Sequence, residues 1–127
     1  MTECLDSWAI LSWLDGDGWA AARVDAVMQT RPVMSWINLG EVSYILERRT
    51  SSTEARRTIQ TLRSQLTLDL PTEDRVLAAA RLKARYSIAY ADAFAITTAI
   101  AHDATLLTGD PEIVNGDPAW PIEDLRR

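Results

Sequence analysis

The chain has 127 residues, 47% of them hydrophobic, which suits one folded domain and excludes a disordered protein. Its net charge of −5 argues against a nucleic-acid binder that relies on a strongly basic surface. The single cysteine, Cys4, excludes an internal disulfide framework. No basic region precedes the first apolar residues, and no apolar run approaches the roughly 20 residues of a membrane span. We therefore expect a cytoplasmic protein without a signal peptide.

The first half of the chain alternates short apolar runs with helical spacing. Cys4 and Leu5 open an apolar strand that ends at Asp6. Small hydroxyl residues, which favour helix N-caps, precede three of the apolar-periodic segments: Ser7, Ser35, and Ser51 or Ser52. The expected segments are a helix to Leu14, a helix over 20–30, an extended piece at 32–34, and helices to about 49 and 64.

The second half continues the same alternation. Leu66, Leu68 and Leu70 alternate with polar residues, which is a strand signature. Thr72 is expected to cap a helix ending near 85, and Ser87 a helix over about 89–102. A second buried strand follows at 104–107, and an edge strand is expected at 120–122. Strands separated by helices predict an α/β fold with a parallel sheet, in a single domain over 1–127.

Four carboxylates occupy positions where packing alone would favour other residues. Asp6 and Asp110 follow the two buried strands, and ligands of open α/β folds bind beyond the carboxyl ends of strands. Glu41 and Asp92 lie on the apolar faces of predicted helices. Each has a plain structural alternative: a helix cap for Asp6, an ion pair for Glu41, dipole compensation for Asp92, and a turn for Asp110.

Together these carboxylates predict a cation site. Several negative groups in one pocket repel one another unless a cation is present. Oxygen ligands suit Mg²⁺ or Mn²⁺. The only histidine, His102, falls at a predicted helix end, and with the lone Cys4 it forms no zinc pattern.

The sequence around these carboxylates resembles the four acidic motifs of PIN domains, with order and spacing similar to VapC toxins of bacterial toxin–antitoxin pairs. The motifs are Leu5-Asp6-Ser7-Trp8-Ala9, Asn38-Leu39-Gly40-Glu41-Val42, Tyr90-Ala91-Asp92-Ala93 and Leu107-Thr108-Gly109-Asp110. The resemblance spans nearly the whole chain. It departs from the family at Trp8, where many relatives carry a small residue.

The resemblance implies an α/β/α sandwich and Mg²⁺- or Mn²⁺-dependent hydrolysis of RNA that leaves 5′-phosphate and 3′-hydroxyl ends. By motif position, Asp6 and Asp92 would be the main metal ligands, and Glu41 and Asp110 would complete the site. Thr108 and Ser7 would support it. The family further implies a homodimer and inhibition by a VapB-type antitoxin, with tRNA or another structured RNA as substrate.

Positive charge is concentrated in one stretch, which can be a solvated helix surface or a phosphate-contacting one. Its residues are Arg48, Arg49, Arg56, Arg57 and Arg63. We take Arg48 and Arg49 as candidate RNA contacts. Specific recognition of RNA often stacks splayed bases on aromatic rings, so Trp13, Trp19 and Trp36 are candidates for stacking or for packing.

Other readings of the acidic pattern are less consistent with the sequence. A receiver domain needs a lysine near the end of its last strand, whereas the only lysine, Lys83, falls in a predicted helix. A haloacid-dehalogenase-type phosphatase needs an Asp-x-Asp pair, but Asp6 is followed by Ser7 and Trp8. A catalytically inactive PIN-fold binding module and a solitary RNA-processing PIN nuclease without antitoxin remain open alternatives.

Overall fold

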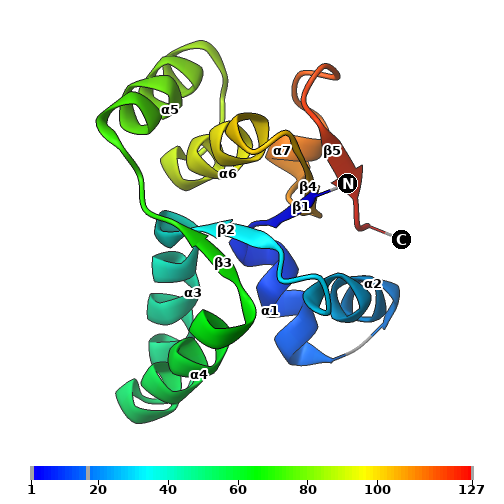
Figure 1. The fold of residues 1–127 in the computed structure, drawn as a ribbon, viewed down its shortest axis with the longest axis vertical. Coiled ribbons are helices and arrows are strands. Elements are labelled where there is room, and N and C mark those ends of the chain that lie inside the picture. The colour runs from blue at the N-terminus through cyan, green and yellow to red at the C-terminus, as the bar shows by residue number, and fades with distance from the viewer. Residues whose placement is uncertain (1, 17, 127) are drawn as a thin grey trace.

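The computed structural model describes residues 2–16 and 18–126, which form one parallel sheet flanked by helices (Figure 1). The strand order is β3-β2-β1-β4-β5, and every pairing is parallel. The strands are β1 (Thr2–Leu5), β2 (Val33–Ser35), β3 (Thr67–Asp69), β4 (Ala104–Thr108) and β5 (Ile122–Asp124). The predicted α/β fold with a parallel sheet is confirmed.

Helices cover both faces of the sheet, so the fold has three layers. The helices are α1 (Ser7–Asp15), α2 (Gly18–Met28), α3 (Trp36–Arg49), α4 (Ser52–Gln65), α5 (Glu73–Arg85), α6 (Tyr90–Ala101) and α7 (Pro111–Val114). Helices α1 to α4 lie on one face, and α5 to α7 on the other (Figure 1). Among the helices of the described ranges, none has the length and apolar character that crossing a bilayer requires.

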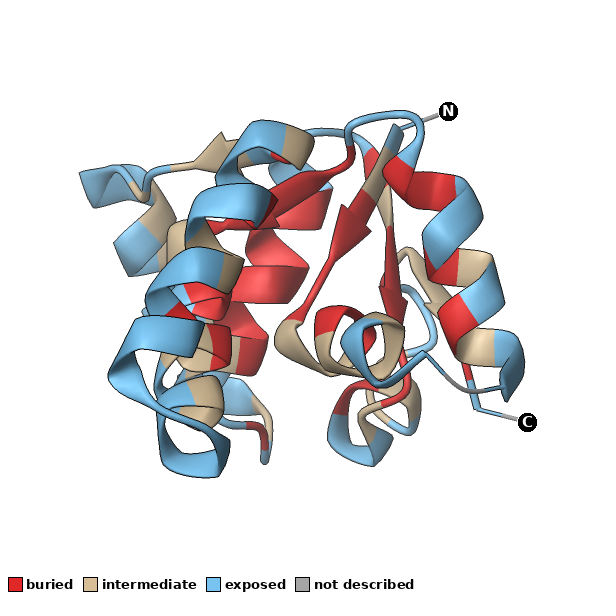
Figure 2. Cartoon of the chain, turned by 90° about the horizontal axis from the view of Figure 1, so that it is seen from below, coloured by how far each residue is buried: buried red, intermediate tan, exposed pale blue. Residues whose placement is uncertain are grey.

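Alternation along the strands builds a separate core on each face. Successive side chains of a strand point to opposite faces, so neighbouring residues enter different clusters. Cys4 and Leu106 pack with α6, whereas Leu5 and Leu107 pack with α1 and α2. The C-terminal ends of β1 and β4, which carry these residues, are buried (Figure 2). This rigid centre holds the strand ends at one edge of the sheet.

The helix starts follow the predicted hydroxyl caps in three cases. The side chains of Ser35, Ser51 and Thr72 accept hydrogen bonds from backbone N–H groups in the first turns of α3, α4 and α5. The prediction for Ser7 is wrong, because Asp6 caps α1 and leaves the Ser7 hydroxyl free for another contact. Ser87 is also not a cap: α6 begins after Ala89, whose N–H is bound by a side chain of the helix itself.

Two features of the C-terminal region differ from the sequence expectation. The edge strand lies at β5, two residues beyond the expected 120–122, because the Trp120 ring is buried in the core and its segment turns before pairing begins. The four-residue helix α7 was not predicted. A helix this short buries one side chain, Ile113, and so leaves no periodic pattern to detect.

Candidate metal centre

Asp6 lies at the centre of the acidic edge of the sheet. The register that pairs Leu5 with Leu107 brings Asp6 beside Thr108, where β1 and β4 both end. One carboxylate oxygen of Asp6 accepts a hydrogen bond from the Thr108 hydroxyl, and the other accepts from the N–H of Ala9 at 2.9 Å. The Asp6 side chain is almost completely buried. The plain alternative for Asp6, a helix cap, therefore describes only part of its role.

Thr108 also positions Asp110. Its hydroxyl oxygen accepts a hydrogen bond from the Asp110 N–H at 3.0 Å, so one side chain links the two aspartates. Gly109 between them lies under the ring of Trp8, and a Cβ at this position would be 2.3 Å from that ring. The indole of Trp8 thus fills the space that a side chain at residue 109 would need. The glycine of the fourth acidic motif therefore accommodates the bulky tryptophan of the first motif.

Asp92 approaches from the start of α6. It is 8% exposed, and one of its oxygens accepts a hydrogen bond from the Ala89 N–H at 3.1 Å. The Asn38 side-chain amide donates to the Ala91 carbonyl oxygen at 3.0 Å and so joins α3 to the first turn of α6. Negative charge is favoured in this turn by the helix dipole, but that interaction does not account for the second acid beside it.

Asp92, Asp110 and Glu112 form an acidic trio. One carboxylate oxygen from each lies within 4.8 Å of the other two. Glu112 was missed by the sequence analysis. It is the second residue of α7, and its N–H donates to Asp110 at 2.9 Å. A Pro-Glu pair directly after the last motif aspartate was the only local signal, because proline favours the first position of a helix and an acid favours its first turn.

Glu41 stands apart from the acidic trio. It is half-buried on α3, and one of its carboxylate oxygens accepts a hydrogen bond from the Ser7 hydroxyl. Its charge acts on Asp6, which lies next to Ser7 in the chain. No lysine, arginine or histidine of the described residues forms an ion pair with Glu41, so the ion-pair alternative for this residue has no partner there. The acidic region therefore comprises the trio, Asp6, which feels the charges of Asp110 and Glu41, and Glu41 itself.

Burial and mutual repulsion raise the pKa of two of these acids. For Asp92, burial raises the pKa to about 7, with further contributions from the charge of Asp110 and from Glu112. For Asp6, burial raises the pKa to about 7 against the opposing hydrogen bonds from Thr108 and Ala9, and the charges of Asp110 and Glu41 add to it. Without a cation, the folded protein therefore holds these carboxylates at an energetic cost.

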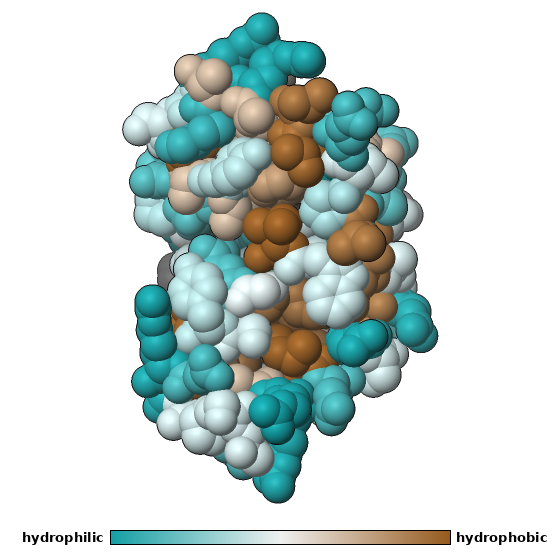
Figure 3. Space-filling model, turned by 90° about the vertical axis from the view of Figure 1, so that its left-hand side faces the viewer, coloured by the Kyte–Doolittle hydropathy of each residue, from teal (hydrophilic) through white to brown (hydrophobic). Residues whose placement is uncertain are grey.

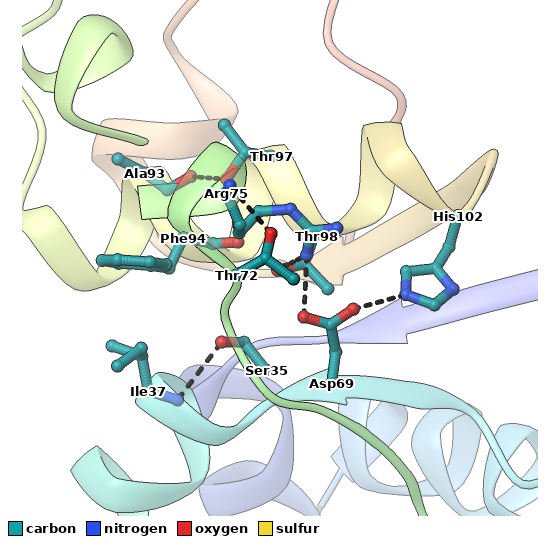
Figure 4. A network of polar contacts seen from close by, with 10 residues as sticks. All are labelled: Ser35, Ile37, Asp69, Thr72, Arg75, Ala93, Phe94, Thr97, Thr98 and His102. Carbon is teal, nitrogen blue, oxygen red and sulfur yellow. Dashed lines mark hydrogen bonds and ion pairs between the residues drawn. The ribbon is translucent and has the colours of Figure 1, made fainter. Parts of the chain in front are cut away.

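A different strand end shows what a neutralised carboxylate looks like in this fold. Asp69, at the end of β3, accepts a hydrogen bond from Arg75 at 2.8 Å and contacts His102 at 2.7 Å (Figure 4). Arg75 also donates to the hydroxyl of Thr98 at 3.1 Å. His102 ends α6, as predicted. Across the described ranges, no such cation pairs with Asp6, Asp92, Asp110 or Glu112.

The donor set fits a hard divalent cation. It consists of carboxylate oxygens, with threonine and serine hydroxyls behind them, and it contains no thiolate or imidazole. Mg²⁺ and Mn²⁺ prefer such oxygen ligands. Asp92, Asp110 and Glu112 are close enough together to share one ion, and the uncompensated charge described above is what such an ion offsets.

The arginine-rich stretch lies on α3 and α4, away from this edge. Arg48 and Arg49 are exposed in the last turn of α3, and the Arg48 guanidinium lies 5.0 Å from the centre of the Tyr44 ring. Arg63 lies 5.3 Å from the Trp36 ring, and Trp13 donates to Asp25 at 3.0 Å, so these two indoles have intramolecular contacts.

Comparisons with known proteins agree with this architecture. A toxin–antitoxin complex from Klebsiella pneumoniae matches with a TM-score of 0.76 at 17% identity over 99% of each chain. VapBC2 from Rickettsia felis bound to a promoter DNA fragment matches with 0.77 at 16% identity over 98% of each. VapC20 from Mycobacterium tuberculosis, a sarcin-ricin loop cleaving toxin, matches with 0.72 at 19% identity over 94% of this chain and 100% of that one.

At these identities the structural likeness shows the fold. A search of curated proteins returned no match. The sequence model of the PIN domain matches residues 4–117, nearly the whole chain and all of the acidic residues described above. The chain therefore belongs to the PIN domain family.

Proposed function

We propose that this chain, as a single domain over 1–127, is a metal-dependent endoribonuclease. The observation that carries the proposal is the group of unpaired carboxylates where β1 and β4 end: Asp6, Asp92, Asp110 and the unforeseen Glu112. PIN domains are generally nucleases, and the family match covers all of these residues. Buried acids that repel one another destabilise a fold, so a site that keeps them without a cationic partner fits a function in binding a cation.

Asp92, Asp110 and Glu112 would hold Mg²⁺ or Mn²⁺, which supplies positive charge against an RNA phosphate and an acidified water as nucleophile. Asp6, which the motifs assign as a ligand, would complete this group, and it orients the Thr108 hydroxyl. Thr108 in turn fixes the Asp110 backbone. Ser7 orients Glu41, whose charge acts on Asp6, and Glu41 would complete the site as the motifs imply.

RNA would approach along α3. Arg48 lies seven residues after Glu41, and Arg49 eight, so all three share one side of the helix. Two turns of helix separate them, roughly 11 Å along the axis, so the arginines would contact a phosphate other than the one at the carboxylates. Because neither Arg48 nor Arg49 forms an ion pair with an acid in the described chain, both are available to phosphate.

We further propose that the chain is the toxin of a toxin–antitoxin pair in the cytoplasm and is inhibited by a VapB-type protein. Support comes from the structural neighbours, several of which are toxin–antitoxin complexes. Copurification with a small neighbouring gene product, and growth arrest on expression that this product relieves, would test the assignment. Growth that is unaffected by expression would favour a solitary RNA-processing nuclease.

A homodimer is proposed on the apolar surface of one side of the molecule. Figure 3 shows an apolar stripe that runs over α5 and α3 on this side. Exposed apolar side chains of these elements and their connections include Ile37, Tyr44, Leu70, Val76 and Leu77. Contiguous apolar surface of this kind marks protein interfaces. Light scattering should give a dimer mass for the wild type and a monomer mass for Leu77→Glu, whereas Glu47→Gln should stay dimeric.

The central test uses purified protein, freed of any bound inhibitor, with a pool of structured cellular RNAs in Mg²⁺ or Mn²⁺. Discrete cuts with 5′-phosphate ends are expected for the wild type and for Glu47→Gln, which neutralises an exposed acid of α3. EDTA and Asp92→Asn should abolish them. Metal binding without cuts would indicate a missing substrate. If the protein neither binds metal nor cuts RNA, the catalytically inactive binding module is the better account.

A further inference from the structure

A pocket of about 430 Å³ adjoins the acidic trio. It lies between the segment that enters α6 and the region around α7, and Glu112 lines it while also belonging to the trio. Its volume falls in the range of roughly 300–1,000 Å³ that is typical of sites for small organic groups. Whatever occupies it would therefore lie directly beside a phosphate held at the carboxylates.

Two aromatic rings form one wall of the pocket. The rings of Tyr86 and Trp120 meet edge-on, with centroids 4.8 Å apart and planes at 65°. Trp120 lies against Gly116, where a Cβ would be 2.2 Å from the indole, so the backbone holds this ring closely. The Tyr86 hydroxyl donates to Asp117 at 2.7 Å. Both rings are thus fixed before any ligand arrives, while the Tyr86 ring remains half-exposed.

The rest of the lining combines apolar and polar groups. Ile88 and Pro111 are apolar, whereas Ser87 and Asn115 are exposed polar residues at the same pocket. The charged group of the lining is the carboxylate of Glu112. A negative wall repels a phosphate but accepts hydrogen bonds from amino and ring N–H groups. A flat, neutral heterocycle with such donors fits this combination better than an anion does.

We propose that this pocket holds one unstacked nucleobase of the RNA substrate, next to the phosphate that is cleaved. The base would stack on Tyr86, contact the edge of Trp120, and present its hydrogen-bonding edge to Asn115 and Ser87. Proteins commonly read single-stranded RNA in this way, by splaying a base onto an aromatic ring. The inference rests on the proposed ribonuclease function and adds to it a determinant of where the RNA is cut.

The first experiment is a titration of the protein in Mg²⁺ with AMP, GMP, CMP and UMP, followed by nuclear magnetic resonance. The indole N–H signal of Trp120 is identified by its loss in Trp120→Phe. At least one nucleotide should shift this signal and the Asn115 side-chain amide, while ribose 5-phosphate, which lacks a base, should not. The pocket assignment is overturned if no nucleotide shifts them, or if ribose 5-phosphate shifts them equally.

The second experiment compares Tyr86→Leu with Tyr86→Phe. Stacking of one base on an aromatic ring corresponds to roughly 5- to 150-fold in affinity, so Tyr86→Leu should weaken nucleotide binding within this range. Tyr86→Phe keeps the ring and should bind close to the wild-type level. Equal binding by the leucine variant, with its fold confirmed by circular dichroism, would refute the stacking role.

Cleavage mapping separates this inference from the proposed function. Tyr86→Leu should retain Mn²⁺ affinity but cut RNA with less preference for the base next to the scissile phosphate. Unchanged preference in an active variant would contradict the pocket assignment. Nucleotide binding at Trp120 by a protein that neither binds Mn²⁺ nor cleaves RNA would support the pocket and overturn the nuclease proposal alone.

Discussion

Replacing Asp92 by asparagine should stabilise the metal-free protein at high pH. The amide oxygen of asparagine can still accept the hydrogen bond from the Ala89 N–H, and its NH₂ group can donate towards Glu112. The substitution therefore removes mainly the charge. It is a test of whether the folded protein in fact stores electrostatic repulsion at this edge.

The magnitude follows from the pKa of Asp92, which is about 7 in the folded protein against 3.8 for an ordinary aspartate. Because the folded pKa is raised, the folded state binds more protons than the unfolded state between pH 4 and pH 7, and stability falls as pH rises through this window. The full difference corresponds to about 4 kcal/mol above pH 7. Solvent screening at the mouth of the site reduces the expected gain to about 2 kcal/mol at pH 8.

Urea unfolding of wild type and Asp92→Asn at pH 8 and pH 4.5, both in EDTA, measures this difference. The variant should be more stable at pH 8, and the difference should largely disappear at pH 4.5. Saturating Mg²⁺ or Mn²⁺ should reverse the order at pH 8, because a cation that binds only the folded wild type stabilises it by mass action. Glu47→Gln, an exposed substitution on α3, should stay within about 0.5 kcal/mol of wild type throughout.

Equal stability of wild type and Asp92→Asn at pH 8 in EDTA would refute this reasoning. It would mean that water or conformational relaxation already compensates the Asp92 charge. If Asp92→Asn is more stable than the wild type at pH 8, but Mg²⁺ and Mn²⁺ do not stabilise the wild type, the electrostatic account holds. That result would count against the metal site.

Three further sets of substitutions test separate parts of the account. Arg48→Ala with Arg49→Ala should weaken RNA binding and leave Mn²⁺ affinity unchanged. The slope of log affinity against log salt should fall by about 0.7 to 0.9 per lost phosphate contact. Filter binding at several salt concentrations measures this slope, and an unchanged slope would remove both arginines from the RNA surface. Thr108→Val removes both hydrogen bonds of the hydroxyl and should lower the free energy of unfolding by about 1–3 kcal/mol. Thr108→Ser keeps the hydroxyl and should lower it by less. An equal decrease in the two variants would count against the hydrogen bonds. Gly109→Ala should cost about 1–3 kcal/mol in urea unfolding through its clash with the Trp8 ring, and adding Trp8→Ala should recover part of that loss; strictly additive losses would contradict the contact.

Local patterns determined much of the secondary structure. The caps at Ser35, Ser51 and Thr72 were predictable because each hydroxyl binds an N–H two or three residues away. The strand at 104–107 was predictable from its apolar run, and the structure extends it only to Thr108. Asp6 and Ser7 were both local candidates for the α1 cap; Asp6 caps the helix, and the Ser7 hydroxyl binds the distant Glu41 instead.

The candidate site was predictable in outline because its acids follow strands or begin helices. The sequence alone indicated that Asp6, Glu41, Asp92 and Asp110 are unusual for their positions. It could not show that Asp92 and Asp110 are close to Glu112, or that the charge of Glu41 acts on Asp6. These relations depend on how α6, α7 and α3 pack at the sheet edge.

The sequence by itself determined the alternation of strands and helices, the acidic motifs and the family, since all of these are recorded in residues a few positions apart. Only the tertiary structure decided that Asp69 pairs with Arg75 and contacts His102 while the acidic trio has no cationic partner in the described residues, and that Tyr86 meets Trp120 beside Glu112. The reason is physical: capping and side-chain alternation act within one or two turns, whereas charge compensation and pocket formation join segments that only packing of the whole chain brings together.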